Sequence, residues 1–98
     1  MLARIVRWEG GNPEDVKKTA AEIRQQADEA GGPPPGVPAT EFMLLHDANG
    51  NAMALTFFEN EADYAEGDAT LSSMDPPGGG MGQRVGVDKY EVAARFEA

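Results

Sequence analysis

Two different spacings of apolar residues run along the chain, and they predict both strands and helices. Residues 2–8 are rich in β-branched and apolar types without helical spacing, which predicts a first strand. Asn12 and Pro13 then provide an N-cap and a first helical residue, so we expect a helix over residues 13–30. The apolar stripe of this helix consists of Val16, Ala20, Ile23, Ala27 and Ala30. Gly31 and the prolines that follow it end the helix.

A β-hairpin is the next predicted feature. Residues 40–47 and 52–59 are two apolar runs of strand length, and Asn49-Gly50 lies between them. An Asn-Gly pair flanked by such runs is a strong hairpin signal. Both runs are apolar at nearly every position, so we expect both faces of this part of the sheet to be covered.

The last third of the chain predicts a helix, a loop and a strand. Residues 60–74 open with Asn60 as a cap and form a weaker helix, which Gly67 interrupts. The helix is acidic and has no basic residue, so its outer face is expected to be solvated. Residues 75–83 have the composition of a loop, and residues 85–97 form the last strand.

The resulting order, β-α-β-β-α-β, predicts the fold class. It is typical of a single α+β domain of the ferredoxin-like type over residues 1–98, with a four-stranded antiparallel sheet and two helices on one face. The other face would then expose apolar residues of the hairpin, which a monomer seldom leaves bare. Leu, Ile, Val and Phe make up only 17 of 98 residues, so the core is thin. We therefore expect a homodimer formed through the sheet.

Composition excludes several functions. Eight Lys and Arg against 17 Asp and Glu give a net charge of −9, which disfavours binding to nucleic acid. The sequence has no apolar run of membrane-spanning length and no signal-peptide pattern at its N-terminus, so we expect a cytoplasmic protein without membrane contact. With no Cys, disulfides, thiolate catalysis and cysteine metal sites are excluded, and no metal or cofactor is expected.

Four segments together give a resemblance that spans nearly the whole chain. They are the opening strand with Arg and Trp before a turn (3–10), the hairpin (44–58), the entry to the second helix (57–63) and residues 87–92. In these the chain resembles the dimeric α/β-barrel family that includes antibiotic-biosynthesis-monooxygenase-like proteins. The resemblance implies dimerisation through the sheets into a barrel, and an activity ranging from cofactor-free oxygenation or haem degradation to none known. The Asn/Trp/His arrangement of the haem degraders is not matched, so no catalytic residue is carried over.

The candidate site residues are aromatic, with one imidazole. His46 is the natural acid or base by its pKa class, and a structural residue beside Asp47 is the alternative. Trp8 could stack on a flat ligand or belong to the core. Tyr64 and Tyr90 leave the same choice, since each phenol could donate a hydrogen bond to the carbonyl of a ligand or pack in the core. A ligand site between sheet and helices, with residues 78–82 as a flap, would be lined by Trp8, His46, Phe58, Tyr64 and Tyr90.

Two polar features have structural interpretations. The strand residues Arg4, Arg7 and Arg95 each need an anion, which could be Glu41 or Glu91, a ligand, or a residue across a dimer interface. Residues 47–51 resemble the start of a calcium loop, but the twelfth position of that loop would be a Phe, so they predict a hairpin turn.

Two classes of function remain. The first is a small homodimeric domain that binds an apolar or aromatic ligand between sheet and helices, or has no ligand and acts through partners. The second is a monooxygenase or isomerase that works without a cofactor. A pocket with convergent polar groups would favour the enzyme, whereas a filled core would favour the binding or interaction domain.

Overall fold

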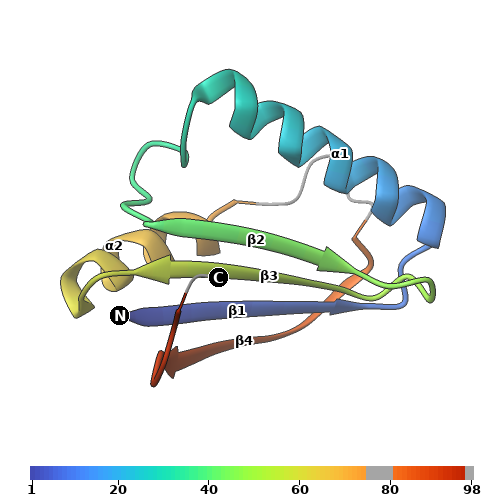
Figure 1. Cartoon of the computed structure of the whole chain (residues 1–98). Coiled ribbons are helices and arrows are strands. Elements are labelled where there is room, and N and C mark those ends of the chain that lie inside the picture. The colour runs from blue at the N-terminus through green and yellow to red at the C-terminus, as the bar shows by residue number, and fades with distance from the viewer. Residues whose placement is uncertain (75–80, 97–98) are drawn as a thin grey trace.

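The sheet and both helices form in the predicted order. The computed structural model describes residues 1–74 and 81–96. Its elements are β1 (Leu2–Glu9), α1 (Pro13–Ala30), β2 (Glu41–His46), β3 (Ala52–Phe58), α2 (Glu61–Ser72) and β4 (Gln83–Glu91). The strands lie in the order β2-β3-β1-β4, and all neighbours are antiparallel (Figure 1). This α+β arrangement confirms the predicted antiparallel sheet with two helices and is compatible with a ferredoxin-like fold.

Helix α1 begins and ends where its capping residues predict. The Asn12 side chain accepts hydrogen bonds from the backbone N–H groups of Glu14 and Asp15, and so satisfies two free donors of the first turn. Gly31 adopts a left-handed conformation at φ 72°, and its N–H donates to the Ala27 carbonyl at 3.0 Å. The helix therefore has the predicted bounds at both ends.

The predicted apolar stripe of α1 is only partly buried. Val16 and Thr19 are buried, whereas Ala27 and Ala30 at the other end are exposed. Figure 1 shows the reason, since α1 rises away from the sheet toward its C-terminal end. The apolar spacing predicted the stripe but not how much of it is buried, because the spacing of residues along a helix does not determine the tilt of its axis.

Two hydrophobic clusters lie between the sheet and the helices. The first joins α1 to the hairpin end of the sheet and consists of Val6, Trp8, Val16, Ala52, Ala54 and Met81. The second lies under α2 and consists of Val37, Phe58 and Tyr64, with Leu2, Ala39 and Leu71 packed at its side. Gly67 lets α2 approach this second cluster, because an added Cβ would overlap the ring of the fully buried Phe58.

The last strand is shorter than predicted. Strand β4 ends at Glu91, which is the register partner of Leu2, the first residue of β1. Beyond this point β1 has no further residue to pair with, so the prediction of a strand to residue 97 is wrong. The Val92 N–H donates to the Met1 carbonyl at 2.9 Å, and the chain then leaves the strand direction.

Two other boundaries shift or fall outside the described chain. Helix α2 has Asn60 as its N-cap and ends at Ser72, slightly inside the predicted range. Residues 78–80 of the predicted flap lie outside the described residues, whereas Met81 is buried in the first cluster. No helix in residues 1–74 and 81–96 has the length and apolar character needed to cross a membrane.

Candidate functional site

The side of the sheet that faces away from the helices is the candidate site, and we call it the open face. Strand residues alternate between faces, and the buried positions Val6, Ala54 and Phe58 fix which side the helices cover. The strand register then arranges the open face in three rows that cross the strands. The strap row is Glu41, Phe57, Ala3 and Tyr90; the middle row is Met43, Leu55, Ile5 and Asp88; the hairpin-end row is Leu45, Met53, Arg7 and Gly86.

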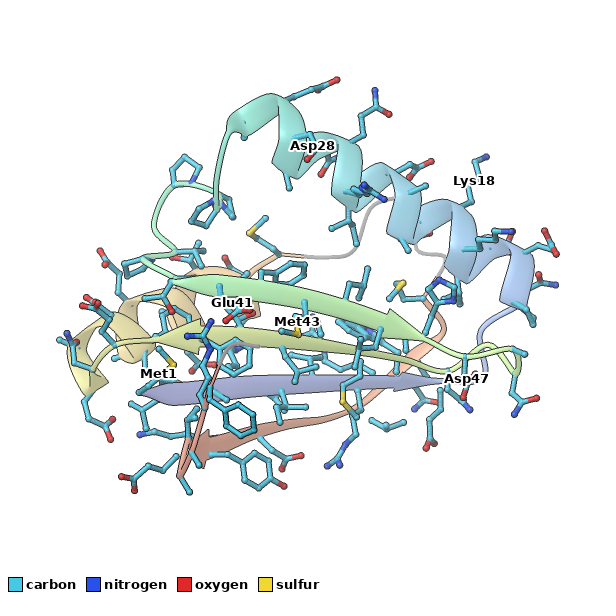
Figure 2. All side chains as sticks on the ribbon, viewed as in Figure 1. Met1, Lys18, Asp28, Glu41, Met43 and Asp47 are labelled. Carbon is cyan, nitrogen blue, oxygen red and sulfur yellow. The ribbon has the colours of Figure 1, made fainter. Side chains whose placement is uncertain are left out.

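The middle and hairpin-end rows expose apolar side chains. Met43 is 42% exposed, Leu45 is more exposed still, and Ile5, Met53 and Leu55 are half-buried. Figure 2 shows Glu41, Met43 and Asp47 in order along this edge of the sheet, from the strap row to the hairpin turn. Adjacent apolar side chains on a solvent-facing sheet are typical of an interaction surface.

The C-terminal residues 92–96, which we call the strap, cross the open face at one end. Arg95 reaches Glu41 on the opposite edge strand, where Nη2 lies 2.9 Å from the carboxylate oxygen. Ala3, which lies between Phe57 and Tyr90 in the strap row, is only 5% exposed although no helix covers its face. Phe96, at the end of the strap, is 92% exposed.

A hollow opens at the other end of this face. It has a volume of about 300 Å³ and is open to solvent. Its lining consists of Arg7, Trp8, Glu9, Leu45, His46, Asp47, Asn51, Ala52 and Met53. Arg7 forms an ion pair with Asp88 beside it, so the positive charge at this end is already compensated.

The hairpin turn beside the hollow is held by Asp47. Its carboxylate accepts hydrogen bonds from the backbone N–H of Asn51 at 3.0 Å and of Asn49 at 2.8 Å, and from the Asn51 side chain. These bonds to the charged form lower the pKa of Asp47, with those from Asn51 foremost. The Asp47 carboxylate therefore stabilises the hairpin turn. Within the described part of the chain, no group of three acidic, His or Cys residues could hold a metal ion.

The five predicted ligand-contacting residues do not converge on one site. Phe58 and Tyr64 meet in a T-shaped contact, with ring centroids 5.5 Å apart, in the cluster under α2. Trp8 is buried in the other cluster, although it also lines the hollow together with the exposed His46. Tyr90 lies in the strap row of the open face, on the opposite side of the sheet from Phe58.

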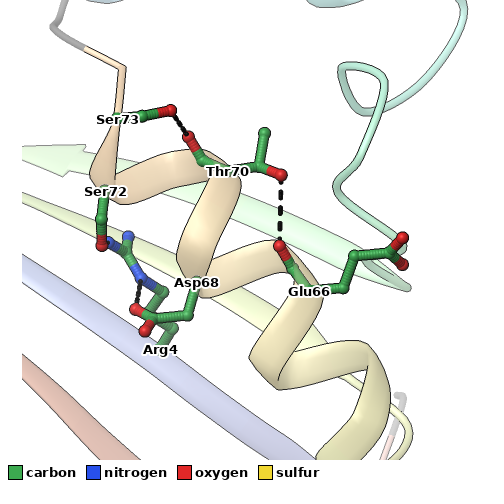
Figure 3. Close-up of polar contacts among 6 residues, drawn as sticks. All are labelled: Arg4, Glu66, Asp68, Thr70, Ser72 and Ser73. Carbon is green, nitrogen blue, oxygen red and sulfur yellow. Dashed lines mark hydrogen bonds and ion pairs between the residues drawn. The ribbon is translucent and has the colours of Figure 1, made fainter.

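The three arginines that were expected on strands find their anions within the chain, although Arg95 lies in the strap and not in β4. Arg95 pairs with Glu41, which is one of the predicted partners, and Arg7 pairs with Asp88. Arg4 is buried beneath α2, where Nε donates to Asp68 at 2.8 Å and Nη2 to Ser72 at 3.3 Å (Figure 3). The sequence analysis missed this contact. One signal in the sequence could have predicted the contact between Arg4 and Asp68. It is an arginine on the helix-facing side of a strand, together with a helix that has acidic residues but no basic residue.

A second ion pair joins α2 to the sheet. The Lys89 Nζ donates to Glu61 at 2.5 Å and lies 4.8 Å from the centroid of the Tyr64 ring. The hydrogen bond to Glu61 raises the pKa of Lys89, whereas burial and the nearby Asp68 raise that of Tyr64. Two of the four acids of α2 therefore anchor the helix, and the expectation of a purely solvated acidic face is too simple.

Comparison with known proteins adds no assignment. No family model matches the chain, and no curated protein or solved structure matches it significantly. The functional argument for this protein therefore depends on its own geometry.

Proposed function

We propose that this protein is an interaction domain that works as a homodimer, in which the open faces of two sheets pack against each other as in a dimeric α/β barrel. The observation that carries the proposal is the pair of apolar rows on a sheet face without helices. Packing two such faces together would remove these side chains from water, which is the main favourable contribution to protein association. Methionine and aromatic residues are also enriched in the cores of interfaces.

The distribution of charge supports this face over any other. Helix α1 carries five acidic and three basic residues, and α2 carries four acidic residues and none that are basic. The helices thus hold six of the nine net negative charges of the chain. On the open face, Arg7 pairs with Asp88 and Arg95 with Glu41, so these four charges cancel, and the carboxylate of Glu9 remains at the edge of the hollow. Two copies can therefore meet there with little repulsion, while their acidic helices point away from each other.

Neighbouring residues of β2 provide a matched test. Met43 and Phe42 are 42% and 46% exposed, but they point to opposite faces of the same edge strand. Met43→Glu would place a carboxylate from each copy in the proposed interface, so we expect dimerisation to weaken by about a hundredfold or more. Phe42→Glu adds the same charge on the helix side and should leave the dimer intact. Sedimentation velocity over a concentration series measures both.

The outcomes separate the alternatives clearly. A wild-type chain that stays monomeric at tens of micromolar (about the strength of a weak biological dimer) would overturn the proposal. Loss of the dimer in Phe42→Glu, with Met43→Glu unaffected, would move the interface to the helix side. Circular dichroism of both variants checks that each is folded.

The small-molecule function stays a prediction. A ligand between sheet and helices would have to displace packed side chains, because Phe58 and Tyr64 already contact each other and Trp8 lies in a core cluster. A panel of aromatic compounds titrated against Trp8 fluorescence tests it, since entry of a ligand would change the surroundings of this single indole. The monooxygenase alternative also stays a prediction, and no specific contact among the described residues favours it.

A further inference from the structure

The strap is stretched across the open face and fixed at both ends. It begins at the hydrogen bond from Val92 to Met1, beside β1, and reaches Glu41 of β2 through Arg95. The sheet order places three strand spacings between β4 and β2, or about 14 Å. Four residues, 92–95, span about 13–14 Å when extended. The Arg95 and Glu41 side chains add further reach, so the strap can cross the sheet, and its two contacts hold it at the strap row.

Phe96 is placed at the end of this fixed segment but makes few contacts in its own chain. It directly follows Arg95, whose ion pair holds it near the edge strand, and it is 92% exposed. A large aromatic side chain that is presented by a restrained backbone loses little entropy on docking. Such residues are typical anchors of protein interfaces.

The free part of the open face is too small to hold two copies together alone. Two rows cover about 14 Å along the strands, and four strands cover about 19 Å across them, a footprint of about 270 Å². A stable interface buries about 800 Å² of accessible surface on each partner. The strap and the hollow lie at either end of the two rows, so they are the parts of the same face that would enlarge the interface.

Symmetry decides how the strap and the hollow meet. A two-fold axis that runs along the strands would stack strap on strap and hold the two sheets apart. A two-fold axis that lies in the interface across the strands instead places the strap of each copy over the hairpin end of the other. We propose that Phe96 of each subunit docks into the hollow of the second copy, against Leu45 and Met53. This inference rests on the proposed homodimer and names the segment that completes its interface.

Disulfide trapping tests the contact directly, because the chain has no cysteine of its own. The single variants Phe96→Cys and Met53→Cys are mixed and oxidised gently. We expect a covalent heterodimer, since docking brings the two positions within the roughly 7 Å that a disulfide bridges. Ala27→Cys, exposed on α1, is the matched control and should not cross-link with Phe96→Cys. Strong cross-linking of Phe96→Cys with itself would mean that strap lies on strap, and would overturn the inference.

Phe96→Ala gives an independent readout. The side chain is almost fully exposed within its own chain, so the unfolding midpoint of the monomer should not change. The dissociation constant of the dimer should rise by about thirtyfold or more, which is the loss of affinity expected when an interface anchor is removed. A wild-type dimer that is unaffected by Phe96→Ala and shows no cross-link to position 53 would refute the strap contact while the homodimer stands. A monomeric wild type would refute the homodimer itself.

Discussion

Gly67 lies in the middle of α2, where ordinary helix propensity and the structure predict opposite effects of Gly67→Ala. On propensity alone, Ala in place of Gly inside a helix stabilises by about 1 kcal/mol. In this protein the added Cβ would overlap Cε1 and Cζ of the Phe58 ring. Phe58 is fully buried and is held by its T-shaped contact with Tyr64, so its ring cannot swing away freely.

The magnitude follows from these contacts. Overpacking a buried site costs about 1–3 kcal/mol. Loss of the aromatic geometry with Tyr64 adds about 0.5–1.5 kcal/mol. After the propensity gain is subtracted, we expect Gly67→Ala to lower the free energy of unfolding by about 0.5–3.5 kcal/mol. For a domain of this size each kcal/mol lowers the melting temperature by about 4–8 °C.

Thermal unfolding followed by circular dichroism, at one fixed protein concentration, measures the effect. Ala65→Gly, at an exposed position of the same helix, is the control for propensity and should cost about 1 kcal/mol. In a Phe58→Leu background the overlap is relieved, so Gly67→Ala should become much less harmful. A rise in melting temperature for Gly67→Ala in the wild-type background would refute the close approach of α2 to Phe58.

Three further predictions concern charged and titrating groups. Asp68→Ala leaves the buried Arg4 without its partner carboxylate and should lower the free energy of unfolding by about 1–3 kcal/mol. Arg4→Met removes the buried charge itself and should lower it by less. Urea unfolding that gives the opposite order of the two variants contradicts this. The lowered pKa of Asp47 means that its contribution to stability is present above the ordinary value of 3.8 and is lost as the pH falls through the folded value. Asp47→Asn should therefore destabilise at neutral pH and have no effect in strong acid, as melts across the acid range would show. The pKa values of Tyr64 and Lys89 are raised, so their contributions to stability are complete below the ordinary values of 10.0 and 10.5 and are lost as the pH rises through the folded values. Tyr64→Phe removes one of the two groups and should make the loss of stability at alkaline pH shallower. An unchanged alkaline profile contradicts this.

The elements of the fold could be predicted because their signals are local. The cap at Asn12 and the left-handed Gly31 define α1 from within a few residues of its ends. The hairpin turn is likewise determined by a short segment, in which Gly50 takes a φ of 86° and Asp47 bonds to the backbone two and four residues later. Sequence order then limits the sheet to few topologies, so the antiparallel arrangement follows from the elements themselves.

The features that could not be predicted depend on distant partners. The tilt of α1, which exposes Ala27 and Ala30, is determined by how the helix seats on the sheet. The end of β4 at Glu91 depends on where β1 begins, since a strand needs a neighbour. For the candidate site, apolar spacing predicted that the hairpin strands carry apolar side chains on both faces. It could not show that Phe58 and Tyr64 would meet on one side of the sheet and Tyr90 lie on the other.

The strap explains why the two ends of the open face differ, although the apolar pattern of its strands is the same along their length. Strand β4 can pair with β1 only as far as Leu2, so the residues after Glu91 must leave the sheet. Their hydrogen bond to Met1 and the ion pair between Arg95 and Glu41 turn them across the open face at the strap row. The hairpin end has no such cover, because its strands join through a tight turn held by Asp47 and leave a hollow instead. A face with a raised end and a hollow end is complementary to a second copy of itself after a half-turn, which is the geometry that a closed two-fold dimer requires.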